Sequence, residues 1–187
     1  MKELSLVYQY DKLGNLTRTE DSTELVTVMT YNQRGQILSH TKQNKDASKQ
    51  ISVHKAYDIY GNVTSDTDAN GIVVNYTYNA ANQLILMQNA GQINKVTTYT
   101  YDANGNRTSE TDWLGNKTTF RYDGMNRLIE SKDSLGNVMS QLEYNIDHAQ
   151  SASYDSYGNC TSYEYDKNLR LVKTVDPYLY EVTNGYM

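Results

Sequence analysis

The sequence is poor in several residue types: of 187 residues, one is cysteine, one proline, one phenylalanine and one tryptophan. The single cysteine, Cys160, allows no disulfide within the chain, which excludes a small secreted module held together by disulfides. No run of about 18 apolar residues is present, so we expect no insertion into a membrane. The net charge is −5 and lysine and arginine form no cluster, which argues against nucleic acid as a partner.

Tyrosine is the one abundant aromatic residue. There are 18 tyrosines, while apolar residues of all kinds make up only 38% of the chain. A tyrosine ring can be buried while its hydroxyl still forms hydrogen bonds or meets water. With so few leucine, isoleucine, valine and phenylalanine side chains, the tyrosines are needed to bury any surface at all.

A short pattern recurs along the chain: an aromatic residue, any residue, Tyr, Asp or Asn, and then Gly-Asn. Its clearest copy runs from Tyr99 to Thr108. Successive anchor tyrosines are 21 to 26 residues apart as far as Tyr144, and then 10 and 11 residues apart. The anchors are Tyr10, Tyr31, Tyr57, Tyr78, Tyr101, Tyr122, Tyr144, Tyr154 and Tyr165. Repetition at a period near 20 predicts an array built from one supersecondary unit.

The residues after each anchor tyrosine are typical of a tight turn. Asp or Asn follows every anchor, and Gly or Asn comes three residues later, except at His148 and Leu169. An Asp or Asn side chain can accept a hydrogen bond from the backbone two residues on, and Gly or Asn tolerates a positive φ. The repeat-defining residues include Tyr10, Asp11, Gly14, Tyr57, Asp58, Gly61, Tyr101, Asp102, Gly105, Tyr122 and Asp123. These residues predict a three-residue hairpin turn with a bulge.

Alternating residues on both sides of the turn predict strands, and a second turn follows about ten residues later, as in Asp112 to Gly115. We therefore predict an all-β fold, a repetitive array of antiparallel β-hairpins. Residues 1–187 form a single array in this interpretation, with regular repeats over about 8–142 and degenerate repeats over 143–187. The polar stretch 43–52 is expected to be a loop insertion.

The repeated pattern resembles the YD repeat of Rhs proteins, and similar repeats occur in teneurins, in cocoon-forming subunits of insecticidal Tc toxins and in bacterial wall-associated proteins. The resemblance covers roughly residues 8–176. It implies an extended curved sheet, an arc of a hollow shell that often encloses a C-terminal toxin. It also implies a secreted or cell-surface parent protein, although the first residues lack the apolar stretch of a signal peptide.

Candidate sites for chemistry are few. Asp66, Asp68 and Asn70 match the first half of a calcium-binding loop, but Thr77 stands where a bidentate Glu is needed, so a repeat turn is the favoured interpretation. The histidines share no motif with Cys160, and no pair of carboxylates stands out. We therefore expect no enzyme, no cofactor and no metal.

The tyrosines allow two interpretations. If they pack across strands, they are structural. If they line an open groove, Tyr78, Tyr101 and Tyr122 are candidates for stacking on glycans. We favour a structural wall segment whose partners are the rest of the repeat array or an enclosed toxin. The alternative is a carbohydrate-binding or adhesion module, and a weaker third interpretation is a degenerate glycosidase. Open strand edges also predict self-association.

Overall fold

The computed structural model describes residues 6–91 and 95–186, and every regular element in these residues is a β-strand. The strands are β1 (Leu6–Tyr10), β2 (Leu16–Asp21), β3 (Leu25–Tyr31), β4 (Ile37–Asn44), β5 (Gln50–Tyr57), β6 (Val63–Thr67), β7 (Val73–Tyr78), β8 (Leu84–Asn89), β9 (Val96–Tyr101), β10 (Arg107–Thr111), β11 (Lys117–Tyr122), β12 (Leu128–Lys132), β13 (Val138–Tyr144), β14 (Gln150–Tyr154), β15 (Cys160–Tyr165), β16 (Leu171–Val175) and β17 (Glu181–Thr183). The residues described contain no helix that could cross a membrane.

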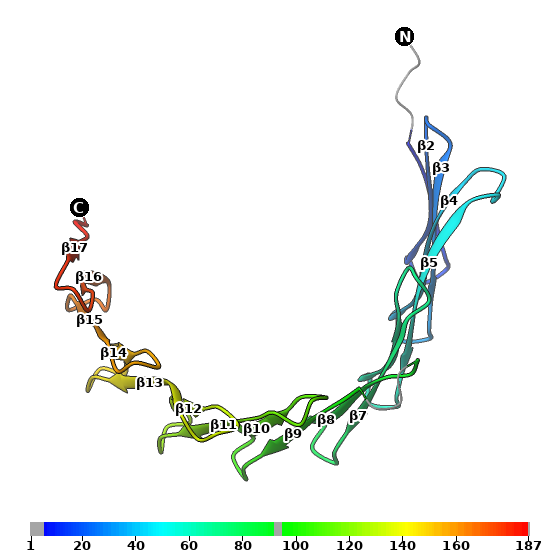
Figure 1. Cartoon of the computed structure of the whole chain (residues 1–187). Helices are drawn as coiled ribbons and strands as arrows, with labels where there is room; N and C mark the ends of the chain where they lie inside the picture. The colour runs from blue at the N-terminus through cyan, green and yellow to red at the C-terminus, as the bar shows by residue number, and fades with distance from the viewer. Residues whose placement is uncertain (1–5, 92–94, 187) are drawn as a thin grey trace. The chain divides into compact units, whose positions relative to one another are not determined.

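The chain divides into two units, residues 1–96 and 97–187. In the first unit β1 to β8 follow one another, each antiparallel to the next. The second unit continues in the same way from β9 to β17. Each unit is a single layer of hairpins (Figure 1). The predicted all-β array of antiparallel hairpins is confirmed.

Two kinds of turn alternate along both units. Where an anchor tyrosine precedes the turn, the strand pairing shifts by one residue, as between Ala56 and Tyr57 or between Thr77 and Tyr78. This is the bulge that the turn residues predicted. Among the second turns that lie wholly in residues 6–91 and 95–186, only the one after Ser131 has this shift. Bulges increase the local twist and fix the register of the strands that they join.

Half of the polar stretch that we expected to be a loop over 43–52 is strand. Residues 43 and 44 end β4, and residues 50–52 begin β5, so the turn occupies only 45–49. Gln43 pairs with Gln50, and Lys42 pairs with Ile51. The extra residues lengthen both strands because polar side chains can face water on either side of an open sheet. Both β4 and β5 have eight residues.

The hairpin pattern continues through residues 143–187, where the sequence is less regular. Tyr154 precedes a second turn, between β14 and β15, and not a first turn. With Tyr154 assigned there, the first-turn anchor after Tyr144 is Tyr165, 21 residues on, and Tyr186 lies a further 21 residues along. The period near 21 is therefore maintained to the end of the described residues.

The sheet has almost no core. Among the described apolar residues only Val26 and Ala152 are buried. The chain exposes 13,027 Å², whereas a compact globular protein of this mass exposes about 9,000 Å². Most strand side chains are half-buried between their neighbours on the same face. Stability must therefore come from contacts within the layer, between one repeat and the next.

Candidate functional site

The first turns are held by the side chain that follows each anchor tyrosine. Asp102 Oδ1 accepts hydrogen bonds from the backbone N–H groups of Asn104 at 3.0 Å and Asn106 at 2.8 Å. Its Oδ2 accepts a third bond from Asn106 Nδ2 at 2.9 Å. Asp11 and Asp58 form the same three bonds. One carboxylate thus satisfies the donors that a tight turn leaves open.

The residue three positions after this Asp or Asn is left-handed in every first turn. Gly61 has a φ of 94° and Asn82 a φ of 59°. His148 and Leu169, the two exceptions to the sequence rule, take φ values of 68° and 59°. The turn geometry therefore persists where the preferred residue is missing, and these two side chains bear the strain.

The anchor tyrosines connect consecutive repeats. Tyr78 Oη donates a hydrogen bond to the carbonyl oxygen of Val63 at 2.9 Å, and Val63 pairs with the preceding anchor, Tyr57. The same contact recurs from Tyr31 to Leu16, Tyr57 to Ile37, Tyr122 to Arg107, Tyr144 to Leu128 and Tyr186 to Leu171. We call this set the tyrosine rungs.

The first turns also contact each other across repeats. Asn62 Nδ2 donates to Asn82 Oδ1 at 2.9 Å, and Asn106 Nδ2 donates to Asn126 Oδ1 at 2.8 Å. In two other repeats an arginine connects the turn aspartate of one repeat to a tyrosine ring of the next. The Arg127 guanidinium pairs with Asp123 at 2.6 Å and lies 4.2 Å from the ring centre of the next anchor, Tyr144. Arg170 relates to Asp166 and Tyr186 in the same way.

The hydrogen bonds in the first turns lower the pKa values of the turn aspartates. The side-chain hydrogen bond from Asn106 holds the pKa of the Asp102 carboxyl below its ordinary value, and Asn62 has the same effect on Asp58. Arg127 lowers the pKa of Asp123 in its turn. Burial raises the pKa of Tyr78. These shifts arise from groups that maintain the turns and strands.

The calcium candidates have other partners. Asp66 lies on β6 and forms an ion pair with Lys55 on β5. Asp68 Oδ1 accepts bonds from the N–H groups of Asn70 at 2.8 Å and Ile72 at 2.9 Å, as in any other turn of the array. No group of three or more acidic, histidine or cysteine residues able to hold a metal is found in residues 6–91 and 95–186.

The glycan-stacking candidates are half-buried strand residues. Tyr78 and Tyr122 use their hydroxyls as tyrosine rungs, to Val63 and Arg107. Tyr101 lies at the end of β9 and is half-buried as well. Tyr10, by contrast, is 60% exposed. Glycan stacking by these rings stays a prediction. The sequence did not indicate that the hydroxyls of Tyr78 and Tyr122 donate to backbone carbonyl oxygens.

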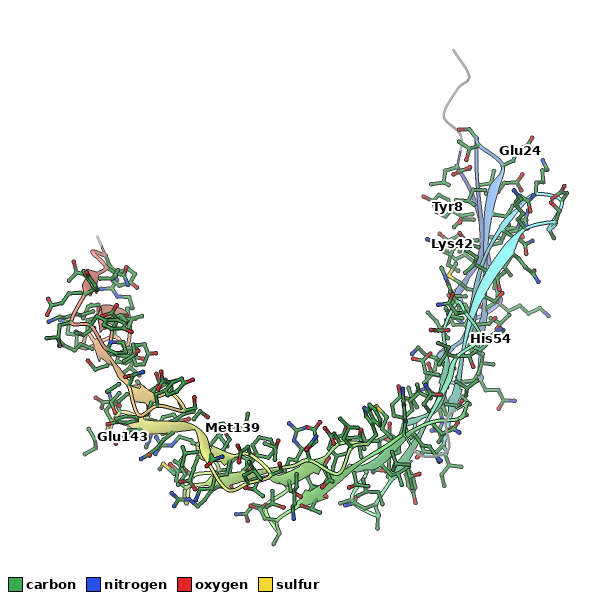
Figure 2. All side chains as sticks on the ribbon, in the orientation of Figure 1. Tyr8, Glu24, Lys42, His54, Met139 and Glu143 are labelled. Atoms are coloured by element: carbon green, nitrogen blue, oxygen red, sulfur yellow. The ribbon has the colours of Figure 1, made fainter. Side chains whose placement is uncertain are left out.

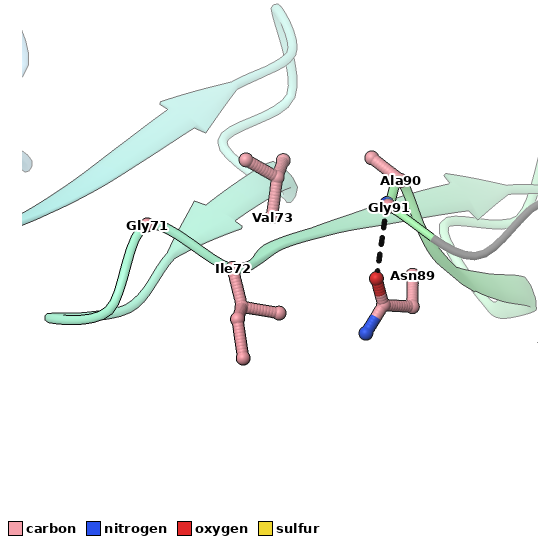
Figure 3. Close-up of a pocket in the computed structure, with 6 residues that line it drawn as sticks. All are labelled: Gly71, Ile72, Val73, Asn89, Ala90 and Gly91. Atoms are coloured by element: carbon pink, nitrogen blue, oxygen red, sulfur yellow. Dashed lines mark hydrogen bonds between the residues drawn. The ribbon is translucent and has the colours of Figure 1, made fainter.

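Cys160 pairs with Tyr154 across two strands, and the hollow beside β7 has no ionisable lining residue. Tyr154 Oη donates to Glu143 Oε1 at 3.1 Å, and the pKa of Tyr154 is raised first by Glu143 and then by Cys160. The hollow in Figure 3, about 450 Å³, is lined by Gly71, Ile72, Val73, Asn89, Ala90 and Gly91. None of these six side chains ionises. Asn89 Oδ1 accepts a bond from the N–H of Gly91 at 3.1 Å.

Solved structures with a similar fold include Tc toxin proteins. The crystal structure of TcdB2-TccC3 matches with a TM-score of 0.77 and 19% identity over 97% of this chain and 11% of that chain. The form without the hypervariable C-terminal region gives a TM-score of 0.76 at 18% identity, again over 97% and 11%. The Tc holotoxin pore of Photorhabdus luminescens, with a substitution in TccC3, gives 0.63 at 17% identity over 96% and 13%.

At these identities the similarity shows the fold alone, and the chain spans about a tenth of the length of the structures it matches. None of the curated proteins matches the sequence. The family model described as RHS Repeat matches residues 57–93 and 91–117, which hold the repeats anchored at Tyr57, Tyr78 and Tyr101. The hairpins and turns of these repeats recur in both units. Residues 57–117, about a third of the chain, therefore match the RHS Repeat family, as the resemblance predicted.

Proposed function

We propose that the chain is a non-enzymatic wall segment of a larger Rhs or YD-repeat protein, in which its sheet forms part of an encapsulating or surface-exposed β-shell. The observation that carries the proposal is the single-layered sheet held by repeat-to-repeat bonds. The tyrosine rungs and the turn-to-turn amide bonds connect consecutive hairpin pairs without a covering layer. Such a sheet can be extended by adding repeats, which is what a wall requires.

The distribution of polar groups supports a structural role. The turn aspartates are saturated by backbone N–H groups and neighbouring amides. The histidines lie on separate elements, His40 on β4, His54 on β5 and His148 in the turn after β13. A hydrolase needs a nucleophile, a base and oxyanion donors around one point. The contacts of the described residues supply structural bonds in place of such a constellation.

The partners in this proposal are the rest of the repeat array and a toxin that the shell encloses, and the parent protein is secreted or at the cell surface. The similarity in fold to a Tc holotoxin pore supports the enclosed toxin and the location outside the cell. We also propose self-association of the isolated chain through β1, whose five side chains are all exposed. A mass independent of concentration in light scattering would contradict that last point.

Electron cryomicroscopy of the longest natural polypeptide that carries this sequence tests the proposal. We expect a hollow shell in which the hairpins of residues 6–186 lie in the wall and pair with further repeats. A particle in which these hairpins project as a separate module, outside any shell, would contradict the wall assignment.

A further inference from the structure

The hairpin β4–β5 departs from the regular repeat and carries three lysines near its tip, Lys42, Lys45 and Lys49. Lys45 Nζ pairs with Glu20 at 3.1 Å. The hydrogen bond to Glu20 and the negative charges of Glu20 and Glu24 raise the pKa of Lys45. Lys42 and Lys49, on the same hairpin, form no ion pair with any of the described residues. Two ammonium groups at this tip are therefore left without a counter-charge.

These two lysines share a hollow of about 710 Å³ with two aliphatic side chains. It is lined by Leu25, Lys42, Gln43, Asn44, Ser48, Lys49, Gln50 and Ile51. Leu25 is 45% exposed and Ile51 59% exposed. Lys42 pairs with Ile51 across the strands, so both side chains leave the same side of the sheet. Figure 2 shows Lys42 on the side of β1–β5 that also carries Tyr8.

The polar atoms of Asn44 are already used within the hairpin. Its Nδ2 donates to Ser48 Oγ at 2.7 Å, and its Oδ1 accepts from the N–H of Lys49 at 2.8 Å. These bonds hold the rim of the hollow in shape. The charged groups that can meet a ligand in the hollow are the ammonium groups of Lys42 and Lys49, and its apolar groups are the aliphatic side chains of Leu25 and Ile51.

We infer that this hollow binds an acidic peptide in which carboxylates flank an aliphatic side chain. Leu25 and Ile51 would contact the aliphatic group, while Lys42 and Lys49 would pair with the carboxylates. Such a ligand supplies the missing negative charge and covers exposed apolar surface at the same time. The inference does not depend on the proposed wall function, since it rests on contacts within one hairpin and its neighbour.

Other anionic ligands fit less well. A nucleic acid binds through about six to ten phosphate contacts, and an anionic membrane through clusters of about four to eight basic residues. The hollow offers two free lysines. None of its eight lining residues is aromatic, so no ring face is available to stack on an acidic sugar.

Fluorescence anisotropy with the complete 187-residue chain tests the inference. The probe is a fluorescein-labelled peptide of sequence Ser-Glu-Ser-Leu-Ser-Glu-Ser in low-salt buffer. We expect saturable binding that weakens with added salt. Lys42→Gln or Lys49→Gln should raise the dissociation constant about threefold, and the double variant about tenfold. Replacing the peptide leucine by serine should weaken binding as well.

Lys45→Gln and Lys12→Gln are the matched controls, because each removes one positive charge outside the proposed contacts. Both should bind the peptide as the unchanged chain does. All substituted side chains are exposed, and circular dichroism confirms that each variant is folded. Absence of saturable binding, or equal effects of Lys42→Gln and Lys12→Gln, would overturn the inference. The inference would also be overturned if the chain bound polygalacturonate or anionic phospholipid vesicles through Lys42 and Lys49 but did not bind the peptide.

Discussion

Acidification below about pH 4 is expected to unfold the chain, with the midpoint of thermal unfolding falling by roughly 10 °C or more before the transition is lost. The groups responsible are aspartates whose pKa is lowered in the folded chain, mostly by turn bonds. They are Asp11, Asp21, Asp46, Asp58, Asp102, Asp112, Asp123, Asp133, Asp155 and Asp166. A lowered pKa means that the unfolded chain binds protons more tightly. The stabilisation is therefore complete above the unfolded-state pKa and is lost as pH falls through the folded-state pKa.

Thermal melts followed by circular dichroism over a pH series measure this effect. The double variant Asp58→Asn/Asp102→Asn is the control. The natural turn at Asn32 shows that an amide oxygen can accept the same two backbone bonds, from Arg34 at 2.9 Å and Gln36 at 3.0 Å. The variant should keep its stability near neutral pH and lose less on acidification. A midpoint that stays constant into strong acid would contradict the role of the turn carboxylates.

Gly61→Val is expected to destabilise the chain by about 2 kcal/mol. The φ of Gly61 is 94°, a region that a β-branched residue strongly disfavours. A Cβ there would also lie 3.2 Å from Gln36 Nε2, whose bond to the Gly61 carbonyl joins two first turns. Urea unfolding at neutral pH measures the loss.

Leu169→Gly is the converse experiment. Leu169 already has a φ of 59°, so glycine should relieve strain and stabilise the chain by about 0.5 kcal/mol, after the entropy that glycine loses on folding.

Gly61→Asn should cost less than Gly61→Val, because Asn82 occupies the same position in the next repeat. Equal losses for Val and Asn at position 61 would show that backbone conformation does not control these turns.

The turns and the fold class could be predicted because their determinants are local. An Asp with a Gly three residues later, as in Asp102 and Gly105, specifies a turn without reference to the rest of the chain. Sequence reasoning failed where several positions compete. Tyr154 precedes an Asp and a Gly like an anchor does, and only strand pairing shows that it precedes a second turn. Residues 43–52 looked like a loop because they are polar, yet an open sheet accepts polar strands on both faces.

The tyrosine rungs could not be predicted from the sequence. The period identifies Tyr78 as an anchor, but its acceptor is the carbonyl of Val63 in a neighbouring hairpin, and that pairing depends on the bulge at Tyr57. The hollow beside Lys42 and Lys49 has the same origin, since it requires the register between β4 and β5. Such contacts between distant residues need the strand pairing itself.

The central claim, that the tyrosine rungs hold consecutive repeats together, is tested most directly by comparing Tyr78→Phe with Tyr10→Phe in urea unfolding. Tyr78 donates its hydroxyl to Val63, whereas the Tyr10 hydroxyl has no partner among the described residues and its side chain is 60% exposed. We predict a loss of about 1 kcal/mol for Tyr78→Phe and almost none for Tyr10→Phe. An unchanged stability in both variants would contradict the claim.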